Sequence, residues 1–159
     1  MKGLIINKMH SGYFTNMSEV FNLLPEEELN CMWLVSSYEC NIYPFEQIPF
    51  EEEYVWMKGT ELKEILNQEE VMFIWGNFTS YPSNTKLKDI LKYPIPFADG
   101  NSDLWKKDVH LSNPLSNTEL ISWDSSIFLA LSKNTNLIEG LKDNYPDSED
   151  LSTYNSDID

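Results

Sequence analysis

The chain has 159 residues, and its 26 aspartates and glutamates outnumber 11 basic residues to give a formal net charge of −15. Every basic residue is lysine, so the chain lacks both the basic surface and the arginine forks that nucleic-acid binding normally uses. Aromatic residues make up 13% of the chain, more than a disordered acidic segment carries, so we expect a folded protein with a buried core.

Membrane and export signals are not evident in the sequence. No window reaches the roughly 18 apolar residues that a membrane span needs, and residues 1–6 are too short and too weakly basic for a signal peptide. We therefore expect a cytoplasmic protein that does not bind membranes. Cys31 and Cys40 are expected to be reduced and structural, and their odd spacing predicts opposite faces of one strand.

The first elements alternate between strand and helix patterns. Residues 2–7 predict a short strand, and residues 17–24 predict a helix that Asn16 or Ser18 caps. Residues 26–28 are three glutamates, which we interpret as a solvated turn. Residues 30–38 alternate well enough to predict a strand with Met32, Leu34 and Ser36 on one face.

The next stretch is rich in proline and aromatic residues. Residues 40–50 predict an aromatic loop or an edge strand, and residues 54–57 predict a short strand. A helix is expected from its cap at Thr60 to about Gln68, because Leu62, Ile65 and Leu66 form an apolar stripe.

Residues 71–81 are the most β-like and least charged window of the chain. Their continuous apolar run predicts a strand that is buried on both faces. We expect this strand to emerge at an edge, where Asn77 and Ser80 would meet water. The window contains no catalytic signature, so we interpret it as scaffold.

The stretch that follows is the least regular. Residues 84–91 predict one or two helical turns with Asn84 or Thr85 as the cap. Residues 95–116 show no periodicity, and irregular segments of this length in a compact domain are often functional. This segment is therefore our main candidate for a site.

The last part of the chain predicts a hairpin and two helices. Residues 118–123 and 127–131 predict two strands joined by Asp124-Ser125-Ser126. A helix is expected over about 135–142, with Asn134 or Thr135 as its cap, and a final short helix follows from Asp147. The predicted fold class is α+β: a mainly antiparallel sheet with three to four helices packed on it, as a single domain over residues 1–155 with an acidic tail at 156–159.

A metal or hydrolase site is one reading of the irregular segment. Asp99, Asp103, Asp108 and His110 offer oxygen and nitrogen ligands, but their spacings of 4, 5 and 2 match neither an EF-hand nor a His-x-x-x-His pattern. Turn and cap chemistry explains the same residues more simply. We expect no metal and no other cofactor.

Catalytic motifs are equally sparse. His10 and His110 are the only histidines, no Gly-x-Ser-x-Gly motif accompanies them, and the six glycines are too scattered for a phosphate loop. Paired carboxylates are expected by chance in so acidic a chain. We therefore expect a protein that is not an enzyme.

An interaction surface remains as the leading interpretation, because acids can steer a basic partner and aromatic residues can anchor it. Acids and a tryptophan occur together at two places, around Trp56 and around Trp105, although either tryptophan could instead be a core residue. The candidate partner-binding residues are Glu51, Glu52, Glu53, Trp56, Asp99, Asp103, Trp105 and Asp108.

Several stretches of the second half resemble a known group of proteins. These stretches are residues 59–66 (GTELKEIL), residues 71–78 (VMFIWGNF) with Tyr81-Pro82, the Asp-Ser-Ser hairpin, and the closing residues 145–155. Together they resemble an uncharacterised family of small acidic proteins of low-GC Gram-positive bacteria, similar to immunity proteins of polymorphic toxin systems. The resemblance covers about residues 55–155 and carries over no active site.

Three functional hypotheses follow. The first is an immunity protein that neutralises a cognate, basic bacterial toxin by direct binding, as the resemblance implies. The second is a DNA-mimicking inhibitor of a nuclease or a defence protein, in which carboxylates imitate phosphates. The third is a hydrolase that uses Asp99, Asp103 or His110.

Overall fold

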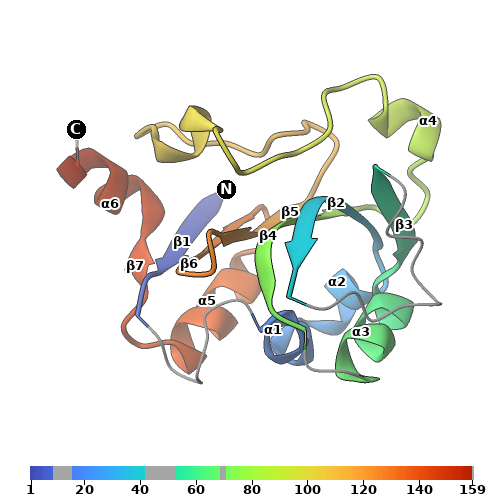
Figure 1. Cartoon of the computed structure of the whole chain (residues 1–159), viewed down its shortest axis with the longest axis horizontal. Helices are drawn as coiled ribbons and strands as arrows, with labels where there is room; N and C mark the ends of the chain where they lie inside the picture. Colours follow the sequence, from blue (N-terminus) through green and yellow to red (C-terminus); the bar gives the residue numbers. More distant parts are fainter. Residues whose placement is uncertain (9–15, 42–52, 69–70, 159) are drawn as a thin grey trace.

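A seven-stranded antiparallel sheet organises the computed structural model, which describes residues 1–8, 16–41, 53–68 and 71–158. The predicted α+β class is confirmed (Figure 1). The strands are β1 (Lys2–Ile6), β2 (Met32–Cys40), β3 (Tyr54–Lys58), β4 (Phe73–Tyr81), β5 (Thr118–Trp123), β6 (Ile127–Ser132) and β7 (Glu149–Asp150). The helices are α1 (Met17–Leu23), α2 (Glu26–Leu29), α3 (Gly59–Gln68), α4 (Leu87–Ile90), α5 (Thr135–Asn144) and α6 (Leu151–Ile158), with a 3₁₀ turn η1 (Ser102–Trp105).

The strands lie in the order β3-β2-β4-β5-β6-β1-β7, and every pairing is antiparallel. The predicted hairpin between β5 and β6 is confirmed. Asp124 and Ser125 have left-handed backbone with φ of 47° and 57°, and the N–H of Ser126 donates to the carbonyl of Trp123 at 3.1 Å. This is the geometry of a type I′ turn, whose twist matches the twist of the paired strands.

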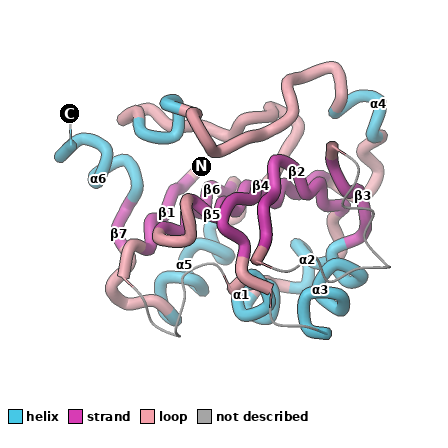
Figure 2. The backbone as a smooth tube through the Cα atoms, viewed as in Figure 1, coloured by secondary structure: helices cyan, strands magenta, loops and turns pink. Residues whose placement is uncertain are grey.

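Both faces of the sheet are apolar, and different material covers each one. Helices α1, α3 and α5 pack on one face, where Phe21, Trp33 and Phe78 form the centre of a large core (Figure 1). The long segment between α4 and β5, which is loop apart from η1, covers the other face (Figure 2). No helix within the described ranges is long and apolar enough to cross a membrane.

Strand β4 is an interior strand and is buried on both faces, as predicted. The prediction that Asn77 and Ser80 meet water is wrong, because both side chains are 0% exposed. Asn77 donates to the carboxylate of Glu119, and Ser80 donates to the carboxylate of Glu28, each at 2.9 Å. The polar residues of this strand therefore bind buried acids.

The two cysteines lie in the same apolar cluster, so the prediction of opposite faces is wrong. Cys31 precedes β2, and the register of β2 shifts between Ser36 and Cys40, where Ser37 has a left-handed φ of 49°. An irregularity of this kind breaks the alternation of side chains along a strand. Both thiols are free and buried, and burial raises the pKa of Cys40 to about 12.

Four local expectations also differ from the structure. Helix α4 begins at Leu87 with Lys86 as its N-cap, so neither Asn84 nor Thr85 caps it. Residues 26–29 form helix α2, and Glu28 is buried, so this is not a solvated turn. Helix α3 begins at Gly59, which places Thr60 inside it. Helix α6 continues to Ile158, so residues 156–158 are helical. The predicted caps Asn16 and Asn134 are confirmed, because each side chain accepts from the first turn of its helix.

Part of the chain cannot be compared with the sequence predictions. His10, most of the aromatic stretch at 40–50, and the candidate residues Glu51 and Glu52 lie outside the described residues.

Gly59 lies where the start of α3 touches α2 and β2. A Cβ atom added there would lie 2.6 Å from the carbonyl oxygen of Leu29 and 2.7 Å from Nε1 of Trp33. We therefore predict that Gly59→Ala lowers the free energy of unfolding by about 1–3 kcal/mol, measured by urea denaturation.

Gly140 in the interior of α5 provides the matched control, because a Cβ there meets nothing within 4 Å among the described atoms. Gly140→Ala should raise the free energy of unfolding by about 0.5–1 kcal/mol through better helix propensity. Equal effects of the two substitutions would contradict the close approach at Gly59.

Candidate partner-binding surface

The segment between α4 and β5, residues 91–117, forms a structural layer of the protein and includes the irregular stretch predicted at residues 95–116. We call it the covering segment. Its residues Ala98, Leu104 and Val109 are buried against Ile121 of β5 and Leu129 of β6. The segment therefore supplies the apolar cover that a helix would otherwise give to this face of the sheet. Leu111, Asn113 and Ser116 are buried as well, and the exposed residues of the segment form part of the surface.

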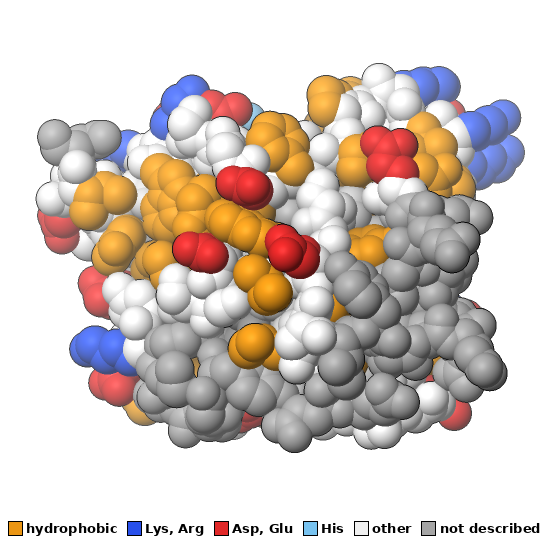
Figure 3. Space-filling model, viewed as in Figure 1, with side chains coloured by type: hydrophobic (Ala, Val, Ile, Leu, Met, Phe, Trp, Pro, Cys, Tyr) orange, Lys and Arg blue, Asp and Glu red, His pale blue; other side chains and the backbone are white. Residues whose placement is uncertain are grey.

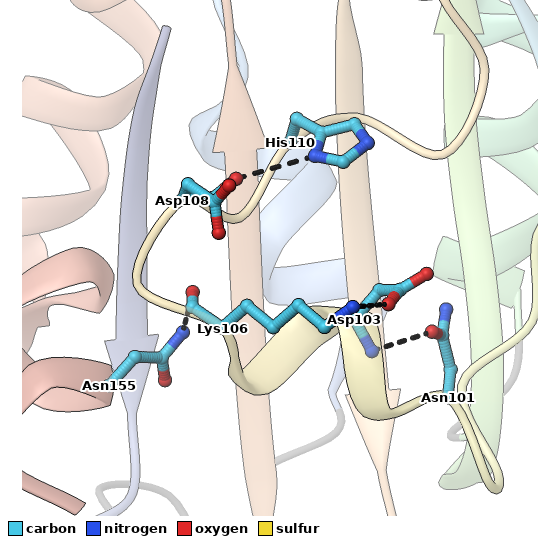
Figure 4. Close-up of polar contacts among 6 residues, drawn as sticks. All are labelled: Asn101, Asp103, Lys106, Asp108, His110 and Asn155. Carbon is cyan, nitrogen blue, oxygen red and sulfur yellow. Dashed lines mark hydrogen bonds and ion pairs between the residues drawn. The ribbon is translucent and has the colours of Figure 1, made fainter. Parts of the chain in front are cut away.

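Buried asparagines fix the middle of this layer (Figure 4). Asn155 of α6 donates to the carbonyls of Leu104 at 3.0 Å and Lys106 at 2.8 Å. Asn101 accepts from the N–H of Asp103 at 3.1 Å and so caps η1. These contacts pair backbone groups of a segment that has few regular hydrogen bonds of its own, and the Lys106 carbonyl also accepts from the N–H of Val109 at 3.1 Å.

The first and last parts of the layer are also tied to the sheet and to α4. The hydroxyls of Ser36 and Ser37 donate to the carbonyl of Pro96 at 2.8 and 3.0 Å. Asn113 donates to the carbonyl of Ile90 at 3.3 Å. The segment is thus held along its length by hydrogen bonds from side chains.

Glu119 of β5 is a buried acid beneath this layer. Its carboxylate accepts from the N–H of Ser112 at 2.9 Å, the hydroxyl of Ser112 at 2.8 Å and the amide of Asn77 at 2.9 Å. Burial raises the pKa of Glu119, and the bonds from Ser112 and Asn77 oppose that rise. Glu119 therefore connects β4, β5 and the covering segment.

Glu28 is the corresponding buried acid on the helix face. It accepts from Ser80 at 2.9 Å and from Asn134, the cap of α5, at 3.5 Å. Burial raises its pKa, again against the effect of these hydrogen bonds. Glu28 therefore links α2 to β4 and to the start of α5.

Four half-buried aromatic side chains form a continuous row at the hairpin end of the sheet. The ring centroids of Trp75 and Trp123 are 5.1 Å apart, those of Trp123 and Trp105 are 4.9 Å apart, and those of Trp105 and Tyr154 are 6.4 Å apart. The four residues come from β4, β5, η1 and α6. We call Trp75, Trp123, Trp105 and Tyr154 the aromatic row.

Exposed acids lie beside the aromatic row. Asp124 follows Trp123 in the hairpin turn, Glu39 is paired with Trp75 across β2 and β4, and Asp157 lies three residues after Tyr154 in α6. Figure 3 shows a broad hydrophobic area on this side of the molecule with acidic side chains at its margin. The surface therefore combines an apolar centre with acids at its margin, while Lys106 and Lys107 follow Trp105 at the η1 end.

The candidates predicted in the irregular segment have separate environments. Trp105 is part of the aromatic row, whereas Asp99 and Asp108 are exposed. Asp103 forms an ion pair with Lys106, which lowers the pKa of the carboxyl (Figure 4). The charge of Asp103 is therefore partly compensated within the protein.

The candidates around Trp56 belong to another part of the molecule. Trp56 of β3 is half-buried and packs against Tyr81, with ring centroids 5.8 Å apart, in a cluster separate from that of Trp105. Glu53 is exposed just before β3. The two predicted tryptophan sites therefore do not form one surface.

Trp75 and Trp123 were not among the predicted site residues, although they complete the row. Trp75 lies in the window interpreted as scaffold, and Trp123 ends the strand before the hairpin turn. The sequence predicted both a central strand and the hairpin. Pairing these two elements, as β4 and β5 are paired in the structure, would have brought Trp75 close to Trp123.

The cluster considered for metal binding or hydrolysis has other contacts. Across the described ranges, no group of three or more His, Cys, Asp or Glu residues is placed to hold a metal ion. Nδ1 of His110 lies 3.3 Å from the backbone carbonyl of Asp108 (Figure 4). The hydroxyl of Ser112 donates to the carboxylate of Glu119. His110, Ser112 and Asp103 line a cavity of about 210 Å³ together with Pro94 and other neighbours.

Comparison with known proteins finds no matching family model, no similar curated protein and no similar solved structure. The resemblance described above therefore rests on the residues quoted for it.

The Asn155 contacts predict a measurable role for this side chain. Asn155→Ala removes the amide donor from the carbonyls of Leu104 and Lys106, although the Lys106 carbonyl keeps its bond from the N–H of Val109. The variant should lower the free energy of unfolding by about 1–3 kcal/mol. Asn144→Ala is the control, because the Asn144 amide donates to the carbonyl of Gly140 at an exposed position. Equal urea midpoints for the two variants would contradict the anchoring role.

Glu119 predicts a specific pH dependence of stability. Because its folded pKa is raised from 4.5, its contribution to stability is fully present below about pH 4.5 and is lost as the pH rises through the folded pKa. Glutamine does not titrate, so Glu119→Gln should not show this loss of stability. The free energy of unfolding of the variant should therefore rise relative to that of the wild type as the pH rises.

The control is Asp99→Asn, which removes one carboxylate at an exposed position instead of a buried one. The measurement is urea denaturation at a series of pH values. If the free energy of unfolding of Glu119→Gln changed with pH in parallel with that of the wild type, the result would contradict a pKa of Glu119 that is raised by burial.

Proposed function

We propose that this protein acts by binding a basic protein partner and does not catalyse a reaction. The observation that supports this proposal is the surface position of its acid excess. Among the described acids, Glu28 and Glu119 are the only buried ones. Almost all the negative charge of the described residues therefore faces solvent, where it can attract a positively charged protein.

The acid excess is unevenly distributed along the chain. Residues 86–110 contain five lysines and four aspartates and so have a net charge of +1. Since the whole chain has a net charge of −15, the residues outside this segment have a net charge of −16. Glu39, Asp124 and Asp157, the acids beside the aromatic row, all lie outside this segment. The acids predicted at Asp99, Asp103 and Asp108 thus have nearby lysines that offset their charge.

The class of partner follows from the resemblance to immunity proteins. A secreted toxin that must be neutralised inside its producer is bound directly by its immunity protein, and a basic toxin would complement this surface. We therefore propose a cognate basic toxin as the partner, with its active site or substrate groove covered in the complex.

This proposal predicts a strong effect of salt on association. The rate constant for binding the cognate basic toxin should fall at least about tenfold between about 50 mM and about 500 mM salt, because screening removes the long-range attraction. Stopped-flow fluorescence measures this rate constant. An association rate that does not change with salt would contradict electrostatic capture.

A further inference from the structure

We infer that the aromatic row is the place where an arginine or lysine side chain of the basic partner docks. This inference rests on the proposed function, because it names the surface and the contact that the same partner would use. The row offers three tryptophans, and tryptophan is the aromatic side chain that binds cations best through its ring face.

The geometry of the row suits such a contact. The rings of Trp105 and Trp123 are nearly perpendicular, with an interplanar angle of 89°, and those of Trp75 and Trp123 are inclined by 66°. Trp123 is the central member, since it contacts both other tryptophans. All three are half-buried: each packs against the buried cluster beneath it, and each remains partly exposed to solvent.

Charge selects the occupant. Glu39, Asp124 and Asp157 are exposed beside Trp75, Trp123 and Tyr154, whereas Lys106 and Lys107 follow Trp105. The charges therefore favour a cation at the Trp75–Trp123 part of the row. A second copy of this protein would bring the same acids against each other, and an acidic partner would be repelled in the same way. The surface therefore matches a segment that carries arginine or lysine.

The row is also held rigidly before any partner arrives. Asn155 fixes the backbone on both sides of Trp105, and the type I′ turn fixes the position of Trp123 at the end of β5. Because the rings are already ordered by packing on the core, binding orders few additional side chains. Rigid aromatic side chains in such positions are typical anchors of protein interfaces.

The test uses a fluorescent hexa-arginine peptide as the probe and fluorescence anisotropy as the readout. Trp123→Ala should raise the Kd of the peptide about tenfold, and Trp123→Phe, which keeps a ring and most of the packing, should raise it about threefold. Tyr54→Ala is the matched control, because Tyr54 is also a half-buried aromatic residue but packs in another cluster, and the Kd of this variant should stay within about twofold of wild type.

The outcomes separate this inference from the proposed function. If the wild type binds the peptide with a salt-dependent Kd that Trp123→Phe and Trp123→Ala leave unchanged, the docking site is overturned while capture of a basic partner stands. If Trp123→Ala does not fold by circular dichroism, Trp123→Phe alone decides between these results. If the wild type binds neither the peptide at low salt nor a basic cognate toxin, the proposed function itself fails.

Discussion

Two buried carboxylates hold the three layers of this protein to one strand. Glu119 binds Asn77 of β4 and Ser112 of the covering segment, and Glu28 binds Ser80 of β4 from the helix side. A buried carboxylate is tolerated only where donors replace the water that it loses. The polar residues of β4 are therefore a requirement of the fold, and the two acids fix which segment covers each face.

The position of the candidate surface follows from the same contacts. Glu119 attaches the returning part of the segment at Ser112, and Asn155 attaches its middle at Leu104 and Lys106. With both points fixed, Trp105 lies perpendicular to Trp123 at 4.9 Å between centroids. The positions of the aromatic side chains in the row therefore depend on the hydrogen bonds that hold the covering segment, as well as on the strands and helix that carry the other members.

Local patterns in the sequence predicted most of the elements, apart from α2, η1 and β7, but not the contacts between them. Strand β4, the β5–β6 hairpin and the caps Asn16 and Asn134 depend on neighbouring residues, and their predictions are confirmed. The burial of Glu28 and Asn77 depends on partners about 40 or more residues away, which periodicity does not reveal. For the same reason, Trp105 was predicted as a site residue while Trp75 and Trp123, its companions in the folded chain, were not.

The central claim of this account is that a basic partner contacts the aromatic row. The most direct test is the ¹H–¹⁵N spectrum of the five indole N–H groups during titration with the hexa-arginine peptide. The account predicts that the signals of Trp75, Trp105 and Trp123 shift, while Trp56 and the buried Trp33, whose Nε1 donates to the carbonyl of Glu28, do not. Shifts confined to Trp56, or a saturating titration that moves none of the three row signals, would contradict it.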